Sequence, residues 1–166
     1  MAELDKICEG KVTFEGIFNF GEIYKFVYTL LQDYEYKLEE RLYSEKSKPN
    51  GKEIEVFWMA KRKISDYFRF RINVNWLTLG MNDVEVQKDG VKVKMSKGRL
   101  EIRFTAFLEK DYEHRWENNT VVKFMRGLYD RYIIKSRIET YEDKIKEETD
   151  EFIAQAKAFL ALEAKL

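Results

Sequence analysis

An alternation of apolar and polar residues through the middle of the chain constrains the fold more than any other feature of the sequence. Its clearest run spans residues 68–76, where aromatic and branched apolar side chains alternate with arginines and asparagines. A period of two places successive side chains on opposite faces of a strand, so one face contacts a core and the other contacts water. Six runs of this kind lie between Tyr34 and Leu108, and they predict an antiparallel sheet.

Turn-forming dipeptides predict how these strands pair. Asp89-Gly90 is the strongest hairpin signal in the chain, and as a two-residue loop it pairs Val86 with Val93. Lys97-Gly98 is interpreted as the next loop of the same meander, followed by a strand that starts near Leu100. Both registers keep the apolar residues on one face, whereas a slip of one residue would separate them.

A short helix is expected before the sheet. A leader over residues 1–10 precedes a strand over residues 11–18. Asn19 then offers an N-cap, and Glu22 three residues later completes a pattern similar to a capping box. Apolar residues follow at helical spacing, which predicts a helix over residues 19–33.

The period becomes helical after the sheet. From Asp111 onward apolar residues recur at helical spacing, and no proline occurs after Pro49. One helix is expected within residues 112–134. A second, over residues 137–165, would be about 44 Å long at 1.5 Å per residue. Residues 111–166 therefore form the C-terminal helices of the prediction.

The element order is β-α-β6-α, carried by residues 11–18, residues 19–32, the six alternating runs between Tyr34 and Leu108, and the terminal helix. This order resembles the helix-grip fold of START and polyketide-cyclase-like domains, and the resemblance spans most of the chain. It implies one α+β domain over residues 1–166, with a curved antiparallel sheet packed against a short N-terminal helix and long C-terminal helices. Such domains often hold an apolar ligand between sheet and terminal helix, and many others act as adaptors or chaperone cofactors. The helix predicted just before the terminal one departs from that pattern.

Few residues offer the chemistry of an enzyme or a metal site. His114 is the only histidine, which excludes sites with several histidine ligands. It is interpreted as a solvated residue at a helix start, with a general base as the alternative. Asp111, Glu113 and Glu117 are interpreted as carboxylates favoured at a helix N-terminus, with a catalytic carboxylate pair as the alternative. Cys8 lacks the setting of a low-pKa nucleophile, and no glycine-rich phosphate loop occurs. No catalytic residue, metal ligand or cofactor is therefore assigned.

Composition favours a cytoplasmic protein. The chain has 30 basic and 30 acidic residues, so no net charge directs it toward nucleic acid or anionic lipid. A single cysteine fits a reducing compartment, and the N-terminus lacks the apolar region of a signal peptide. No apolar run approaches the roughly 18 residues of a membrane span. The charged fraction of 36% resembles that of thermophile proteins.

Four aromatic residues are expected on the concave face of the sheet. They would either fill the core, which is the preferred interpretation, or line a cavity for a flat or acyl ligand. The four candidates for ligand binding are Trp58, Phe70, Trp76 and Phe104.

A hairpin over residues 57–76 carries a dense group of basic residues. A loop centred on Ser65 pairs Ala60 with Phe70 and places the basic side chains together on the outer face, between aromatic residues. Such a face is typical of single-stranded nucleic-acid binding, although a mixed solvated face is preferred because acidic residues neighbour it. The candidates for this site are Lys61, Lys63, Arg69 and Arg71.

The terminal helix carries an apolar stripe that would clamp the sheet or meet another chain. Its end is rich in apolar residues, and an overhanging end would form a surface for self-association. The candidates for this interface are Phe152, Phe159, Leu160 and Leu162.

These observations lead to one main functional hypothesis and two alternatives. The main one is a non-catalytic binding or adaptor module that holds an apolar small molecule or a protein partner between sheet and terminal helix. The alternatives are a homo-oligomer assembled through the C-terminal helices and a single-stranded nucleic-acid binding protein.

Overall fold

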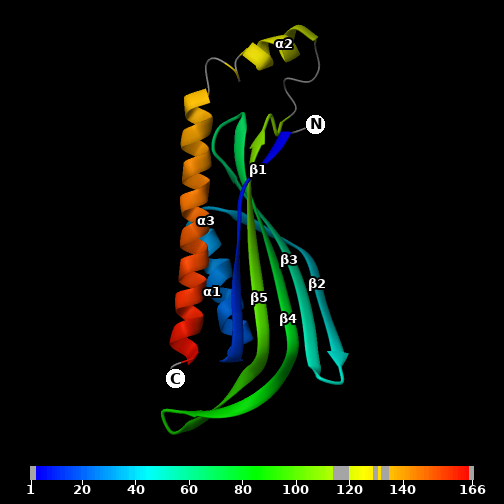
Figure 1. The fold of residues 1–166 in the computed structure, drawn as a ribbon, viewed down its shortest axis with the longest axis vertical. Helices are drawn as coiled ribbons and strands as arrows, with labels where there is room; N and C mark the ends of the chain where they lie inside the picture. The colour runs from blue at the N-terminus through cyan, green and yellow to red at the C-terminus, as the bar shows by residue number, and fades with distance from the viewer. Residues whose placement is uncertain (1–2, 114–119, 129–130, 132–134, 165–166) are drawn as a thin grey trace.

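The computed structural model describes residues 3–113, 120–128, 131 and 135–164. Within these residues, five long strands and three helices follow one another (Figure 1). They are β1 (Glu3–Phe18), α1 (Phe20–Asp33), β2 (Lys37–Lys48), β3 (Gly51–Lys63), β4 (Phe68–Lys88), β5 (Val91–Lys110), α2 (Thr120–Leu128) and α3 (Lys135–Ala164).

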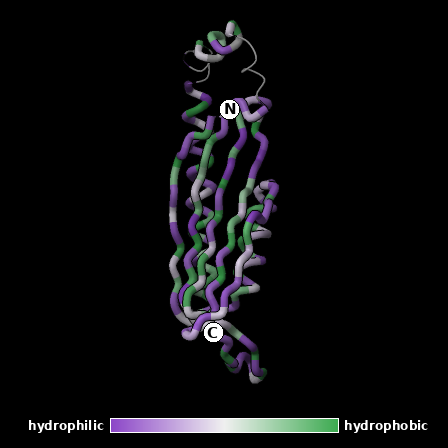
Figure 2. Tube along the Cα trace, turned by 90° about the vertical axis from the view of Figure 1, so that its right-hand side faces the viewer, coloured by the Kyte–Doolittle hydropathy of each residue, from purple (hydrophilic) through white to green (hydrophobic). Residues whose placement is uncertain are grey.

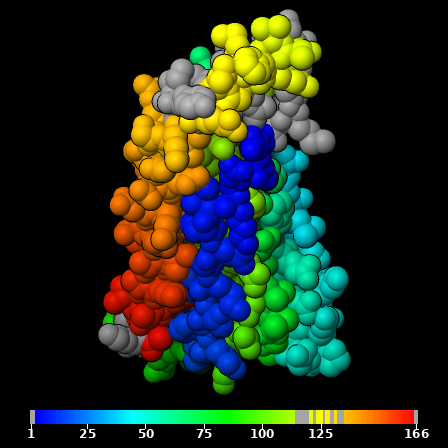
Figure 3. Space-filling model, turned by 45° about the horizontal axis from the view of Figure 1, so that its top comes forward, coloured from blue at the N-terminus to red at the C-terminus, as the bar shows by residue number. Residues whose placement is uncertain are grey.

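The strands form one open antiparallel sheet in the order β1-β5-β4-β3-β2. Helices α1 and α3 lie together against one face, and α3 runs along β1 for most of the length of the sheet (Figures 1 and 3). Hydrophobic and hydrophilic residues alternate along the strands, as Figure 2 shows. The predicted α+β class, with an antiparallel sheet packed against a short N-terminal helix and a long C-terminal helix, is therefore confirmed.

The sheet has fewer strands than the sequence predicts. In the described residues four strands follow α1 instead of six, because β4 covers two of the predicted runs and β5 continues through the predicted turn at Lys97-Gly98. The predicted turn at Lys97-Gly98 is wrong: β5 passes straight through it, and Gly98 pairs with Gly16 of β1. The hairpin at Asp89-Gly90 is confirmed, including the pairing of Val86 with Val93.

Gly98 marks a bend rather than a turn. Gly80 and Met81 of β4 bulge opposite Gly98, and Gly80 has a φ of 59°. A Cβ on Gly98 would lie 2.9 Å from the Met81 Cα and 3.0 Å from the Gly80 carbonyl oxygen. The two backbones approach this closely because no side chain separates them. Beyond this bulge the β4–β5 hairpin curls under the helices (Figure 1).

The hairpin between β3 and β4 has a different register from the predicted one. Phe70 pairs with Arg62, so the register differs by two residues from the expected pairing with Ala60. The hydroxyl oxygen of Ser65 accepts hydrogen bonds from the backbone N–H groups of Tyr67 and Phe68, which closes a short loop. A shift of two residues leaves every side chain on its predicted face.

The N-terminal segment belongs to the sheet. Residues 3–10, expected to be a leader, pair with β5 as the first half of β1. The predicted cap of α1 is present, because the Asn19 side chain accepts a hydrogen bond of 3.1 Å from the Glu22 N–H. The backbone N–H of Asn19 donates to Glu163 at the end of α3, at 2.8 Å. The two helices are therefore joined where α1 begins.

Helix α3 buries a stripe of residues against the sheet and α1. The middle of this stripe carries an ion pair of 2.8 Å between Glu148 and Arg62 of β3, each with a side chain only 12% exposed. Arg62 also donates to the Tyr34 carbonyl oxygen, and the Tyr36 hydroxyl donates to Glu148. The buried residues of α3 are Ile145, Thr149, Phe152, Ala156, Leu160 and Glu163.

Helix α2 lies beyond one end of the sheet (Figure 1). The predicted stripe of this region includes Val121, Phe124 and Leu128, and all three are exposed. Trp116 and Tyr132, which complete the predicted stripe, lie outside the described residues.

Candidate functional site

The four aromatic residues predicted to bind a ligand lie in the core. Their exposed fractions are 0% for Trp58, Phe70 and Phe104 and 2% for Trp76. Tyr24 of α1 occupies the space in front of the two tryptophans, with ring centroids 4.7 Å from Trp58 and 5.5 Å from Trp76. The sheet centre is therefore packed with side chains, as the preferred interpretation has it, and none of the four lines a pocket described below.

A pocket lies instead where the curled hairpin meets the end of α3; we call it the end pocket. It has a volume of about 390 Å³. Three parts of the chain that are distant in sequence supply its walls: the end of β1, the tip region of the β4–β5 hairpin and the last turn of α3. The lining residues are Phe14, Glu15, Gly16, Ile17, Val86, Lys88, Met95, Glu163 and Ala164.

The walls of the end pocket are mainly apolar, with a few charged groups. Phe14, Val86 and Met95 are partly or fully buried, and Lys88 is the only cation among the lining residues. Glu163 accepts the hydrogen bond from Asn19 described above. Burial holds the pKa of the Glu163 carboxyl above its usual value of 4.5, and the neighbouring Glu22 carboxyl raises it further.

The end pocket was not predicted from the sequence, because it forms only through the bend of the β4–β5 hairpin at Gly98. Val86 and Met95 were expected on one face of a hairpin, and they are. Nothing in the local sequence indicates that the bulge opposite Gly98 carries this hairpin under α3. The sequence shows Gly98, but Gly98 was predicted to lie in a turn, and its role in the bend was therefore missed.

A second pocket, which we call the basic pocket, lies near the β3–β4 hairpin, and Lys61, Lys63 and Arg69 line it from the sheet face opposite the helices. Its volume is about 500 Å³. Three of the four residues predicted to bind nucleic acid line it, and the fourth, Arg71, is the cross-strand neighbour of Lys61. The lining residues are Glu35, Lys37, Leu38, Glu39, Met59, Lys61, Arg62, Lys63, Arg69 and Tyr112.

A buried carboxylate organises the arginines of the basic pocket. Glu109 is 4% exposed and pairs with Arg69 at 2.5 Å and Arg71 at 3.7 Å. The Arg69 guanidinium also lies over the Tyr112 ring, 4.6 Å from its centroid. Burial, together with the positive charge of Arg69, holds the pKa of Lys61 below its usual value. Glu109 was not singled out from the sequence, where it is one acidic residue among many.

Most residues predicted to form an oligomer interface are occupied within the subunit. Phe152 and Leu160 are 0% and 1% exposed, and Phe159 stacks on Phe26 with ring centroids 4.7 Å apart. Leu162 is 65% exposed. Of the four residues, Leu162 therefore offers the most surface to another molecule.

The remaining candidate groups show no arrangement for catalysis among the described residues. Burial raises the pKa of the Cys8 thiol, opposite to what a reactive nucleophile needs. Asp111 is buried, Glu113 is exposed, and His114 and Glu117 lie outside the described residues. No group of three or more histidine, cysteine or acidic side chains in the described part of the chain has a geometry that could hold a metal ion.

No protein-family model and no curated protein matches the sequence.

Among the helices that the structure describes, none combines the length and apolar character needed to cross a bilayer.

Proposed function

We propose that the chain is a non-catalytic binding module of helix-grip-like architecture that holds a small, mainly apolar molecule in the end pocket. The observation that carries this proposal is the convergence of three distant segments on one apolar-walled space. Ligand pockets in proteins are concave, largely apolar and equipped with few polar groups, and they measure roughly 300–1,000 Å³. The end pocket meets each of these criteria.

The polar groups of the pocket narrow the class of ligand. The volume of about 390 Å³ is at the small end of the usual range, so the ligand is compact. Lys88 supplies one positive charge beside Val86 and Met95, which suits an apolar body that carries a single acidic group. Glu15 and Glu163 disfavour a second acidic group by like-charge repulsion.

Titration with the fluorophore 1-anilinonaphthalene-8-sulfonate tests the proposal, because this probe combines an apolar ring system with one sulfonate. The native protein is expected to bind it at a single site with enhanced fluorescence. Val86→Asp places a carboxylate on the apolar wall and is expected to weaken binding by about tenfold or more, the cost of an unpaired charge near an apolar ligand.

A matched control uses the same substitution on the same hairpin. Val91 is 63% exposed and does not line the end pocket, so Val91→Asp should leave binding unchanged. Equal affinity in Val86→Asp and the native protein would contradict the proposal. Native mass spectrometry of the purified protein then checks for a bound molecule that Val86→Asp loses.

A further inference from the structure

The basic pocket contains a row of like charges on three neighbouring strands. Lys37 of β2 is paired directly with Lys61 of β3, and Lys61 is paired directly with Arg71 of β4. One row further along, Lys63 of β3 is paired with Arg69 of β4. Like charges directly opposite each other destabilise a sheet, and natural sheets prefer opposite charges in such pairs. A sequence that breaks a local rule in this way often does so at a functional site.

Carboxylates near the row offset part of its charge: Glu35 and Glu39 line the pocket, and Glu39 also lies 2.9 Å from the Arg41 guanidinium. Glu109 is committed to Arg69 and Arg71, and the Asp66 carboxylate lies 2.9 Å from the Lys63 ammonium group. Within the described part of the chain, neither Lys37 nor Lys61 forms an ion pair. The ammonium groups of Lys37 and Lys61 therefore present positive charge beside two arginines that share the single carboxylate of Glu109.

We propose that the basic pocket binds the phosphate group of a small molecule, with Lys61 and Arg69 as the principal ligands. Guanidinium and ammonium groups bind phosphate oxygens through short, charge-assisted hydrogen bonds. The ion pair with Glu109 holds Arg69 in position before the phosphate arrives, which lowers the entropic cost of binding. An anion at this position relieves the repulsion between Lys61 and its cross-strand neighbours.

The other walls of the pocket accommodate the rest of the ligand. The Tyr112 hydroxyl donates a hydrogen bond of 2.7 Å to the Ser65 carbonyl oxygen, which fixes the ring beside Arg69. Leu38 and Met59 add apolar surface on the opposite side of Lys61. A phosphate attached to a flat or apolar group therefore suits the pocket better than an isolated ion.

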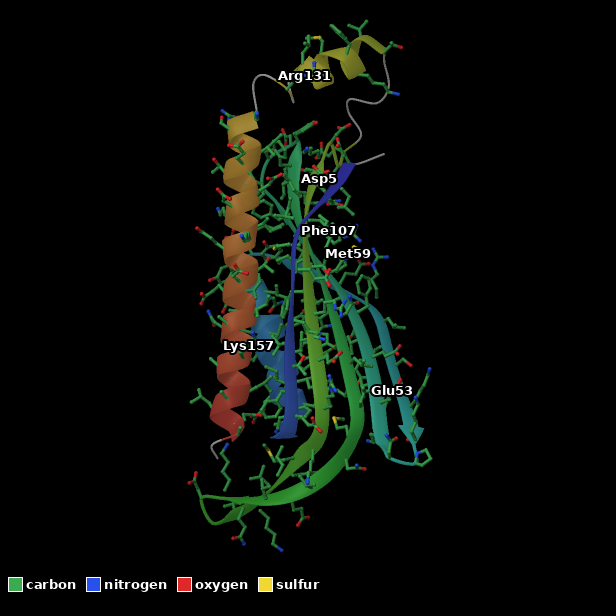
Figure 4. All side chains as sticks on the ribbon, viewed as in Figure 1. Asp5, Glu53, Met59, Phe107, Arg131 and Lys157 are labelled. Carbon is green, nitrogen blue, oxygen red and sulfur yellow. The ribbon has the colours of Figure 1, made fainter. Side chains whose placement is uncertain are left out.

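The charge pattern favours a compact phosphate compound over a nucleic-acid strand. A strand needs a continuous basic track for its backbone. On β3 the outer residues change from Lys61 to Met59 and then to Glu55 and Glu53, and Figure 4 shows Glu53 far down the sheet from Met59. Glu39 lines the edge of the pocket on β2. The positive region is therefore confined to one end of the sheet.

Isothermal titration at low ionic strength tests this inference with inorganic phosphate, pyrophosphate, adenosine monophosphate and a ten-nucleotide single-stranded DNA. The native protein is expected to bind at least one of the small phosphate compounds. Lys61→Gln should lower that affinity about tenfold or more, since one charge-assisted contact contributes about 1.4 kcal/mol or more. Lys94→Gln serves as the matched control, because the Lys94 side chain is 74% exposed on the distant hairpin.

A stability measurement distinguishes a binding role from a structural one. Without ligand, Lys61→Gln is expected to raise the melting temperature, because it removes repulsion from Lys37 and Arg71 while binding is lost. Three outcomes would overturn the inference: no binding of any phosphate compound, equal loss of affinity in Lys94→Gln, or DNA bound far more tightly than each small compound. The end pocket is not involved, so these results leave the proposed function untouched.

Discussion

The Arg62–Glu148 ion pair is the residue-scale contact that joins α3 to the sheet most directly. Arg62 contacts four partners at once: Glu148, the Tyr34 carbonyl oxygen, and the rings of Tyr36 and Phe70, whose centroids lie 4.8 Å and 5.2 Å away. Removing one partner of a buried pair is costly, because the other charge is left without compensation. Removing one partner is therefore expected to cost more stability than the attraction between the two charges contributes.

Glu148→Ala is expected to destabilise the protein by about 2–4 kcal/mol, because it leaves Arg62 and the Tyr36 hydroxyl without their partner. Urea unfolding followed by tryptophan fluorescence measures this loss. Asp83→Ala is the control: Asp83 pairs with Lys94 at 3.2 Å on an exposed surface, and such pairs contribute about 0–1 kcal/mol. A similar decrease in the free energy of unfolding in both variants would show that the buried pair stabilises the protein no more than the exposed one.

Glu163 gives the stability of the protein a pH dependence. Its pKa in the folded state lies above the usual value of 4.5, because burial disfavours its charged form. Ionising Glu163 therefore costs stability as the pH rises from about 4.5 through the raised pKa. Below this window the carboxyl is protonated in both states and the cost disappears.

Glu163→Gln imitates the protonated carboxyl and is expected to remove this cost. Its amide oxygen still accepts from the Asn19 N–H, and its NH2 group can donate to Glu22. The variant should match the native protein near pH 4 and become the more stable of the two as the pH rises to 7. Chemical unfolding at several pH values measures the gap, and a gap that stays constant with pH would refute the assignment.

At the scale of the elements, the bend between the two halves of the β4–β5 ribbon depends on Gly98. An added methyl group there would meet backbone atoms of β4 at 2.9–3.1 Å, and backbone cannot move aside as a flexible side chain can. Gly98→Ala is expected to cost about 1–3 kcal/mol, typical of overpacking, and to weaken fluorophore binding in the end pocket. Gly127→Ala, where a Cβ meets nothing within 4 Å, should change stability by about 1 kcal/mol or less.

Two glycines of this ribbon, Gly90 and Gly98, show what the sequence could and could not predict. Asp89 and Gly90 have φ values of 53° and 77°, the conformation that a two-residue hairpin requires, and the dipeptide therefore predicts its own structure. Gly98 follows a polar residue in the same way, but its role depends on Gly80 and Met81 on another strand. A local pattern contains no information about that contact.

The basic pocket and the end pocket also differ in whether the local sequence is sufficient to predict them. The faces of Lys61 and Arg69 follow from alternation alone, so the basic cluster was predicted even though the hairpin register was two residues off. The end pocket brings Phe14, Val86 and Glu163 together, and their proximity depends on the bend and on where α3 ends. The N-cap at Asn19 was predicted, whereas its contact with Glu163 was not, for the same reason.

At the scale of the whole molecule, α3 is the element that couples the two ends of the sheet. β4 extends from Arg69, which lines the basic pocket, to Lys88, which lines the end pocket. Helix α3 runs along the sheet between these two ends (Figure 1). The helix is anchored at Glu148 in its middle and at Glu163 at its end. Cys8 on β1 lies beside α3, and Thr149, Asp150 and Lys146 of that helix are close enough to influence the pKa of its thiol.

The accessibility of Cys8 therefore reports whether α3 separates from β1. Cys8 is the only cysteine in the chain, so a thiol reagent has a single target. In native buffer at pH 8, labelling by 5,5′-dithiobis(2-nitrobenzoic acid) is expected to be much slower than in urea, because α3 protects the thiol. Glu148→Ala releases one anchor of the helix and should accelerate labelling by about tenfold or more, since each 1.4 kcal/mol of lost protection is a factor of ten. Asp83→Ala should leave the rate unchanged. If labelling of every variant instead follows its global unfolding rate, α3 opens only when the sheet does, and the two pockets belong to one cooperative unit.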